Sequence, residues 1–599
     1  MIDALRTILG FLAPDERRKF YLLMVMIGMM GIADLVGVAS ILPFLAVVSD
    51  PTLIETNRIL ATLWDVTGAT DEQNFLIWLG VGVFAVIVAS LLIKAATVYA
   101  IARFSHMRKY RLADRLFAGY LRQPYTWFLD HHGSKLAKTV LSEVDRAVMQ
   151  SMVPALMILA QVTTLVFVGI LLLVVAPVMA LSAILLIGTV YGVIYVFVRN
   201  RLSTLGQRHV EENTRRFKAA HEALGGIKEL KVEGLEEPFL VRFRRPSFQI
   251  ARILVQTQVI GQMPRFALEA AVFGGLLATV LVFLGGAGPG ALEAFLPKFG
   301  LFAAAGLRMF PAVQQAYHYL SQMRSGRAVL EEVANALAEV DTRPWVPVPR
   351  PAPMGLKEGF ALKGVGFAYP ASSRPVLDGL DLAVPARTTV GLVGGTGAGK
   401  TTAVDLMLGL LIPDSGALVV DGTRIDASNR RAWQASIGYV PQSIYLIDES
   451  VAANIAFGVP KAEIDMKAVV RAARLAALHD FVTTELDAGY DTVVGERGVK
   501  LSGGQRQRIG IARALYRDPD VLILDEATSA LDNLTERAVM EAVANLGGVK
   551  TVVMIAHRLS TVRGCDRIYL MERGRVTAAG GYDALIEESE TFREMAEAS

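Results

Sequence analysis

Glycines, a lysine and two threonines in the segment GLVGGTGAGKTT have the spacing that phosphate binding requires. An apolar run, Thr389 to Val393, leads into Gly394, and Gly399, Lys400 and Thr401 follow after four further residues. Glycines let backbone amide groups converge on phosphate oxygens, and a helix beginning here adds positive potential at its N-terminus. Lys400 can reach the terminal phosphates and the Thr401 hydroxyl can bind Mg²⁺. The segment therefore predicts a nucleotide-binding site.

Two carboxylates, Asp525 and Glu526, follow an apolar run in the segment VLILDEATSALD. The four apolar residues predict a buried parallel strand that carries both side chains at its carboxyl end. In proteins with a phosphate-binding loop, such an aspartate helps to hold Mg²⁺, and an adjacent glutamate can orient or deprotonate the attacking water. The pair therefore predicts ATP hydrolysis as well as ATP binding.

The segment LSGGQRQRIGIARAL, Leu501 to Leu515, resembles the signature motif of ATP-binding cassette (ABC) proteins. It stands directly upstream of the Asp525 strand, as that family requires. The family also has an aromatic residue that stacks on adenine, a Q-loop glutamine and a switch histidine. The matching positions are Tyr369 in VGFAYP, Gln442 in YVPQ and His557 in IAHRLS.

The resemblance implies a role for each matching residue. Glu526 would act on the attacking water, His557 would contact the γ-phosphate, and Gln442 would connect the magnesium to the membrane helices. The implied ATP contacts are Tyr369, Gly394, Thr396, Gly397, Gly399, Lys400, Thr401, Thr402, Ser502, Gly504 and Gln505. The implied Mg²⁺ contacts are Thr401, Gln442 and Asp525. Serine is commoner than threonine at position 396, and we expect no consequence from this difference.

The resemblance also implies a dimer, because two cassettes of this family close head to tail. ATP held by Lys400 and Thr401 of one chain would be completed by Ser502 and Gly504 of the other. Since the glutamate, the histidine and the signature are all intact, both sites of a homodimer would be competent. A heterodimer with one degenerate site is therefore less favoured.

The composition indicates that part of the chain lies in a membrane. Apolar residues make up 53% of its 599 residues and the mean hydropathy is +0.42, which is too hydrophobic for an ordinary soluble enzyme. The formal net charge of +3 gives no reason to expect a nucleic-acid partner. A single cysteine, Cys565, excludes an intrachain disulfide and a cysteine cluster for zinc.

Six apolar runs before residue 325 are long enough to cross a bilayer as helices. They are Phe20 to Val48, Phe75 to Ala102, Met152 to Ala176, Val178 to Val198, Val259 to Leu284 and Phe295 to Tyr319. Lys and Arg concentrate in the segments after the second and fourth runs, which we therefore expect on the cytoplasmic side. Both termini and the cassette would then be cytoplasmic.

Six spans followed by one cassette are the half-transporter layout of ABC exporters, so the resemblance extends over the whole chain. It implies an all-α transmembrane domain with long intracellular helices over residues 1–340, followed by an α/β ATPase domain with the phosphate-binding P-loop over residues 356–599. The proline-rich segment between them, residues 341–355, is expected to be a linker. Gly133 to Leu141 and Arg216 to Glu222 resemble the coupling-helix regions of such exporters.

The loop after the first span contains apolar residues at helical spacing, including Leu53, Ile59, Leu60 and Trp64. This pattern predicts a short amphipathic helix. It has two interpretations: the helix lies on the outer membrane interface, or its apolar residues pack on spans one and two.

Charges inside the spans are the best evidence for the substrate, because they are costly in lipid and usually face a cavity. Arg308 in span six and Arg265 in span five could pair with an anionic headgroup, since guanidinium suits phosphate. The alternatives are structural: Arg308 pairs with Asp34 or Glu269, or Arg265 extends to the cytoplasmic interface. Lys94 in span two lies at a similar depth to Arg265.

A finer resemblance concerns the segments DLVGVASILPF, MPRFALE and LRMFP in spans one, five and six. Together with ARFSHMRKYRLADRLFAGYL, they resemble the ABC exporters that include the lipid-linked oligosaccharide flippases of bacterial protein glycosylation. This implies a homodimeric flippase in a bacterial inner membrane that uses ATP and Mg²⁺ to move an amphipathic lipid-linked substrate. The alternatives are a lipid A-type or multidrug exporter, and a membrane ATPase that gates a channel or a partner without pumping.

Overall fold

The structure is a computed structural model that describes residues 10, 14–49, 51–175, 177–286, 291–340, 343, 346, 349–370, 374–526, 541, 548–556 and 558–597. The side chains of residues 271–273 and 275–302 lie outside this description, as do a few single side chains elsewhere. Contacts between residues divide the chain into two compact units. One comprises residues 1–123 and 130–345, and the other comprises residues 124–129 and 346–599. The division after Trp345 lies within the predicted linker, whose exact bounds stay a prediction.

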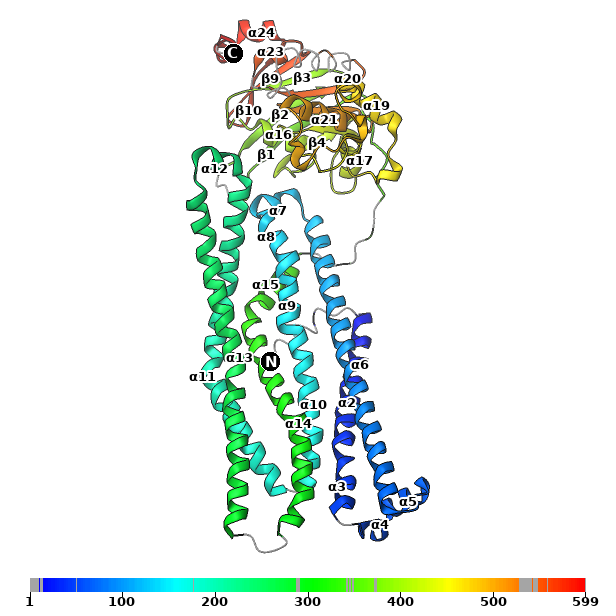
Figure 1. Cartoon of the computed structure of the whole chain (residues 1–599). Helices are drawn as coiled ribbons and strands as arrows, with labels where there is room; N and C mark the ends of the chain where they lie inside the picture. The colour runs from blue at the N-terminus through cyan, green and yellow to red at the C-terminus, as the bar shows by residue number, and fades with distance from the viewer. Residues whose placement is uncertain are drawn as a thin grey trace. The chain divides into compact units, whose positions relative to one another are not determined.

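Long helices build the first unit (Figure 1). They are α2 (Pro14–Ala39), α3 (Ile41–Ser49), α6 (Glu72–Leu121), α10 (Val153–Val175), α11 (Pro177–Gly225), α13 (Glu236–Gly286), α14 (Ala291–Ser325) and α15 (Arg327–Glu339). Among the described residues, four helical stretches are long and apolar enough to cross a membrane: Asp15–Val48, Glu72–Leu121, Gly133–Val175 and Ala180–Gly225. They overlap the predicted spans one to four. Predicted spans five and six belong to α13 and α14, and many of their side chains lie outside the described residues.

The predicted coupling stretches lie in longer helical segments rather than at turns. Residues 133–141 span α8 (Gly133–Lys138) and part of a π-helical turn, Thr139–Glu143, and this run continues through α9 (Val144–Ala147) and a second π-helical turn, Val148–Met152, into α10. Residues 216–222 lie inside α11. The short helices at the two turns are instead α7 (Tyr125–Asp130) and α12 (Ile227–Glu233). The proline before α7 and the glycines on both sides of α12 end the neighbouring helices at these positions.

The amphipathic segment of the first loop forms α4 (Leu53–Thr56) and α5 (Arg58–Thr67). Ile54 and Leu60 are buried in one cluster with Val47 of α3 and Phe75 of α6. This is the packing that the second interpretation of the segment predicts. Ile59 lies on the other face of α5, where it is 71% exposed.

Two sheets form the frame of the second unit. An antiparallel sheet has the order β2-β1-β4-β5, with β1 (Gly359–Phe367), β2 (Leu377–Pro385), β4 (Ser415–Val420) and β5 (Thr423–Arg424). A mainly parallel sheet has the order β10-β9-β3-β8-β7-β6. Its strands are β3 (Thr389–Val393), β6 (Ile437–Val440), β7 (Val521–Asp525), β8 (Thr551–Ile555), β9 (Arg567–Glu572) and β10 (Arg575–Gly580).

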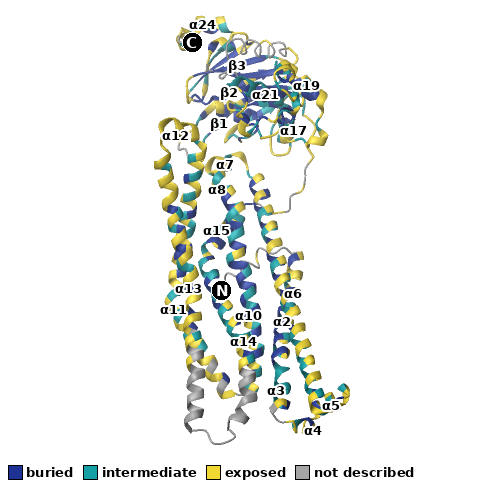
Figure 2. Ribbon diagram, viewed as in Figure 1, coloured by how far each residue is buried: buried dark blue, intermediate teal, exposed yellow. Residues whose placement is uncertain are grey.

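Helices surround these sheets and include α16 (Lys400–Met407), α17 (Arg430–Ala435), α18 (Val451–Ile455), α19 (Met466–Leu475), α20 (His479–Thr484), α21 (Gly503–Leu515), α23 (Leu559–Val562), α24 (Tyr582–Glu588) and α25 (Glu590–Glu597). Every residue of β3, β7 and β8 is buried, as expected for continuous apolar runs in a parallel sheet. Figure 2 shows β3 in the colour of buried residues. Because β3 and β7 both pair in parallel with β8, their carboxyl ends meet at one edge of the sheet. That edge is where ligands of open α/β sheets bind.

Candidate functional site

The phosphate-binding loop joins β3 to α16 at this edge. Gly397 and Gly399 have φ angles of 81° and 97°, a backbone conformation that favours glycine. The Lys400 Nζ donates hydrogen bonds to the carbonyl oxygens of Gly394 at 2.6 Å and Gly395 at 3.1 Å, so the lysine lies across its own loop. Burial lowers the pKa of Lys400, and the nearby Glu526 and Asp525 carboxylates oppose this shift.

The two predicted acidic residues lie at the end of β7. Asp525 is buried, and the Tyr439 hydroxyl donates to its Oδ2 at 3.5 Å. Glu526 has a φ of 49°, which turns the chain out of the strand. The Gln442 Nε2 donates to the Glu526 Oε2 at 2.5 Å. The structure therefore brings together two of the three residues predicted to be catalytic, while His557 lies outside the described residues.

A third carboxylate, Asp405 on α16, adds to the charge near Asp525. Burial raises the pKa of Asp405 to about 6, and the charge of Asp525 contributes in the same direction. The sequence motifs do not single out this residue. In the sequence, Asp405 stands out only as an aspartate within the otherwise apolar segment AVDLMLGLL.

The predicted adenine-stacking residue, Tyr369, lies near the helix that follows the loop. Its hydroxyl is 3.2 Å from the Thr402 Oγ1, and its ring makes an edge contact with Phe367 at 5.1 Å between centroids. Thr402 is buried, whereas Thr401 is exposed at the first turn of α16. Of these two threonines, Thr401 is thus the more accessible to a ligand.

The signature segment begins α21. Ser502 is the N-cap residue: its Oγ accepts a hydrogen bond from the Gln505 amide at 3.2 Å, and the Ser502 amide donates to the Gln505 Oε1 at 2.8 Å. This reciprocal capping box stabilises the start of the helix. Ser502 remains exposed and Gly504 is half-buried, so both are accessible at the surface of the described chain.

In the first unit, both predicted substrate arginines have carboxylate partners. The Arg308 Nη1 lies 2.6 Å from the Asp34 Oδ1, and the Arg265 Nε lies 2.6 Å from the Glu269 Oε1 within one helix. The Arg308 partner is one of the two that the structural alternative predicts, whereas the pairing of Arg265 with Glu269 was not among the predicted alternatives. The role of either arginine in substrate binding stays a prediction.

Asp34 is the centre of a buried cluster that joins four long helices. Its carboxylate accepts hydrogen bonds from Thr164 of α10 at 2.8 Å and Ser90 of α6 at 3.4 Å, in addition to Arg308 of α14. The Lys94 Nζ of α6 lies 4.0 Å away. Asp34 is fully buried, while the side chains of Arg308 and Lys94 are 17% and 31% exposed. The two cations are therefore the accessible part of this cluster.

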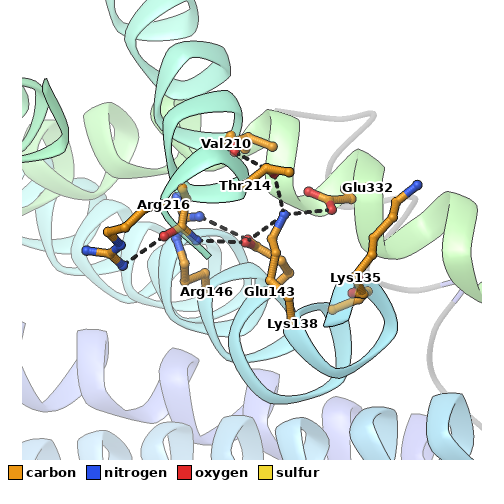
Figure 3. A network of polar contacts seen from close by, with 10 residues as sticks. Lys135, Lys138, Glu143, Arg146, Val210, Thr214, Arg216 and Glu332 are labelled. Atoms are coloured by element: carbon orange, nitrogen blue, oxygen red, sulfur yellow. Dashed lines mark hydrogen bonds and ion pairs between the residues drawn. The ribbon is translucent and has the colours of Figure 1, made fainter. Parts of the chain in front are cut away.

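Figure 3 shows a second buried network, which sequence reasoning missed. Glu143 is fully buried and its carboxylate accepts from Arg146 at 2.9 Å and Asn213 at 3.1 Å. Lys138 lies 3.3 Å from the same carboxylate and donates to Glu332 of α15 at 3.2 Å. The network thus joins the π-helical segment with α11 and α15.

In comparisons with known proteins, one family model matches the helical part of this chain and another matches the part with the two sheets. A family model described as ABC transporter transmembrane region matches residues 40–256, and one described as ABC transporter matches residues 377–529. The ATP-dependent lipid A-core flippase of Chromobacterium violaceum is 30% identical over 90% of this chain and 91% of that protein. The heterocyst differentiation ATP-binding protein HepA of a Nostoc species is 30% identical over 81% of this chain and 79% of that protein.

A solved structure supports the fold. A bacterial Atm1-family ABC exporter with ATP bound matches with a TM-score of 0.77, covering 97% of this chain and 99% of that chain at 24% identity. The fold class expected from the sequence, a helical membrane domain followed by an α/β ATPase domain, is confirmed.

Proposed function

Because the chain belongs to the ABC exporters, as a half-transporter with one membrane region and one ATPase domain, we propose that two copies form a flippase for an anionic lipid-linked substrate. The protein is an ATPase that couples hydrolysis to transport. The specific substrate proposed is a lipid-linked oligosaccharide, and the location proposed is a bacterial inner membrane with both termini and the ATPase unit in the cytoplasm.

The observation that carries the substrate proposal is the charge of the Asp34 cluster. Lys94 and Arg308 surround a single carboxylate, so these three side chains together keep a net charge of +1 in a helix bundle. Charged groups at membrane depth are costly unless they serve a substrate or ion pathway. A diphosphate could bind the accessible faces of the two cations, and guanidinium can donate two hydrogen bonds to it.

The residues of the second unit fit ATP and Mg²⁺. The glycine loop and the first turn of α16 present backbone amides to phosphates. The exposed Thr401 hydroxyl and the Asp525 carboxylate would supply oxygen ligands of the type that Mg²⁺ prefers. Gln442, the third proposed ligand, donates to the neighbouring Glu526. When bound, Mg²⁺ would neutralise charge on the phosphates.

In this proposal the residues of the site have distinct tasks. Lys400 would leave its loop carbonyls to bind the terminal phosphates, and Glu526 would position and deprotonate the water while Gln442 holds its carboxylate. Ser502, Gly504 and Gln505 of a second chain would complete each site. His557 is proposed to contact the γ-phosphate from its position after β8.

A lipid A-type substrate is the second candidate, since several relatives, including those from Chromobacterium violaceum and Cupriavidus pinatubonensis, are named ATP-dependent lipid A-core flippases. The two candidates are separated by ATPase measurements on the full chain in nanodiscs. We expect polyprenyl diphosphate oligosaccharide to stimulate turnover at lower concentrations than lipid A. If only lipid A stimulates ATP turnover, the substrate is of the lipid A type and the oligosaccharide proposal is wrong.

A further inference from the structure

A cavity of about 370 Å³ lies within the first unit, between the second π-helical turn, α11, α13 and α14. Its size is at the lower end of the range of roughly 300–1,000 Å³ found for small-molecule sites. Polar side chains line much of it: Gln150, His209, Gln258, Gln262, His318 and Gln322. The candidate ATP site and the Asp34 cluster contain none of these residues.

The cavity is rich in neutral groups that both donate and accept hydrogen bonds. Four lining residues are glutamines, and the one Lys, Arg, Asp or Glu among the described lining residues is Arg146, whose charge is compensated by Glu143 at 2.9 Å. Carboxamides can donate to and accept from the same partner. This chemistry suits hydroxyl and acetamido groups better than a phosphate or a hydrocarbon chain.

Helical spacing directs these groups to the cavity. Gln258 and Gln262 are four residues apart on α13, and His318 and Gln322 are four apart on α14, so each pair lies on one helix face. The Gln322 Nε2 and His318 Nε2 lie 3.1 Å apart and are hydrogen-bonded to one another. Within the described part of the chain, no partner engages the side-chain amides of Gln150, Gln258 and Gln262. These three amides are therefore available to a ligand.

The two helices approach closely beside the cavity. A Cβ atom added at Gly261 would lie 3.2 Å from the His318 Nδ1, so the glycine allows α13 and α14 to pack at this level. The polar side chains are thereby held on facing helices that the fold fixes. The cavity is open on one side, where Gln258 and Gln262 are exposed, and Gln150 lines it as a half-buried residue.

The order of residues along α13 suggests what binds there. Gln258, Gln262 and Arg265 follow one another at spacings of four and three, on one face, over about 10 Å of helix. The apolar part of the predicted fifth span follows Arg265 toward the outer side. A lipid-linked glycan has the same order: sugars, then diphosphate, then hydrocarbon chain.

We infer that the cavity between α11, α13 and α14 binds the sugar residues next to the diphosphate of the transported lipid, through the amides of Gln258 and Gln262. This inference rests on the proposed function, because it assumes a glycan-bearing lipid as the substrate. The groups recognised are sugar hydroxyls and acetamido groups. A free oligosaccharide carries the same groups. The first experiment below therefore uses a lipid-linked glycan, and the second uses a free sugar.

The first experiment uses the full chain in nanodiscs. ATPase stimulation is measured with polyprenyl diphosphate carrying a short N-acetylglucosamine-containing oligosaccharide and with bare polyprenyl diphosphate. The readout is the ratio of the two half-maximal concentrations. We expect the glycan to lower the half-maximal concentration about tenfold in the wild type, and the ratio to approach one in the Gln258→Leu, Gln262→Leu double variant.

Gln256→Leu is the matched control, because Gln256 lies on the same helix but does not line the cavity. It should keep the wild-type ratio. A double variant that also keeps the wild-type ratio would overturn the inference. A wild type that responds to neither lipid would instead count against the proposed function.

A second experiment tests the cavity without any lipid. In the Cys565→Ser chain, Gln258→Cys should react with a maleimide more slowly when free di-N-acetylchitobiose is added, by at least about threefold at saturation. Gln256→Cys should react at an unchanged rate. Equal rates with and without the sugar at position 258 would refute sugar binding at the cavity, whatever the transport measurements show.

Discussion

The two units hold their charged residues in different ways. In the second unit, Asp525 and Glu526 directly follow a buried strand and Lys400 directly follows a glycine loop, so they are presented at one sheet edge. In the first unit, the buried Asp34 is paired across helices: it contacts Arg308, 274 residues away. The comparison teaches that one unit gathers its charges at a single sheet edge, whereas the other uses them to join helices that are far apart in the sequence.

The largest effect is expected where a charge serves the reaction. Glu526→Gln keeps the shape of the side chain but removes the base, so ATP turnover should fall by roughly 10²- to 10⁴-fold while ATP binding persists. Turnover and nucleotide binding of the full chain measure the two quantities separately.

Glu572→Gln is the control for this change, since Glu572 also ends a strand of the same sheet but carries no motif. Its turnover should equal that of the wild type. Normal hydrolysis by the Glu526 variant would remove the residue from the mechanism.

The next effect concerns stability. Asp34→Asn leaves Arg308 and Lys94, which are 17% and 31% exposed, without their carboxylate, which should cost about 1.5–3 kcal/mol of unfolding free energy. Adding Arg308→Gln should recover part of the loss, with a coupling of roughly 0.5–3 kcal/mol. Unfolding midpoints of the single and double variants in detergent provide this double-mutant cycle.

The Arg265 and Glu269 pair provides the contrast, because it is an i,i+4 pair with Arg265 51% exposed. Its double-mutant cycle should yield only roughly 0.2–0.5 kcal/mol. If the losses of unfolding free energy at Asp34 and Arg308 are strictly additive, their contact does not stabilise the bundle. The two ion pairs would then not differ in the way that we predict.

A further effect on stability is expected at Asp405 and depends on pH. Its folded-state pKa of about 6 lies above the ordinary value of 3.8, so the folded chain binds a proton more tightly than the unfolded chain. Stability from this group is therefore lost as pH rises through about 4 to 6. Asp405→Asn should be more stable than the wild type at pH 7.5, by on the order of 1–3 kcal/mol, and the difference should shrink toward pH 5. A difference that does not vary between pH 5 and 7.5 would contradict this account.

The sequence was most informative where structure and chemistry are local. The loop from Gly394 to Thr401 and the Asp525 strand were predicted because buried apolar runs precede the reactive residues directly. The pairing of Asp34 with Arg308 was only one of several alternatives, since partners on different helices are chosen by packing. The Glu143 network and the π-helical turns were missed for the same reason.

The turns between the long helices were predicted only approximately. Gly133, where one predicted coupling stretch begins, is three residues after the end of α7, and Glu222, where the other ends, is five residues before the start of α12. Helix-ending residues are a physical signal for a turn, and here they marked both turns.

The most direct test of the central claim is transport itself. The full chain is reconstituted in vesicles with a labelled polyprenyl diphosphate oligosaccharide, and movement of the glycan between leaflets is followed after addition of ATP and Mg²⁺. The account predicts ATP-dependent movement by the wild type and none by the Glu526→Gln variant. ATP consumption by the wild type without any movement of the lipid would contradict it.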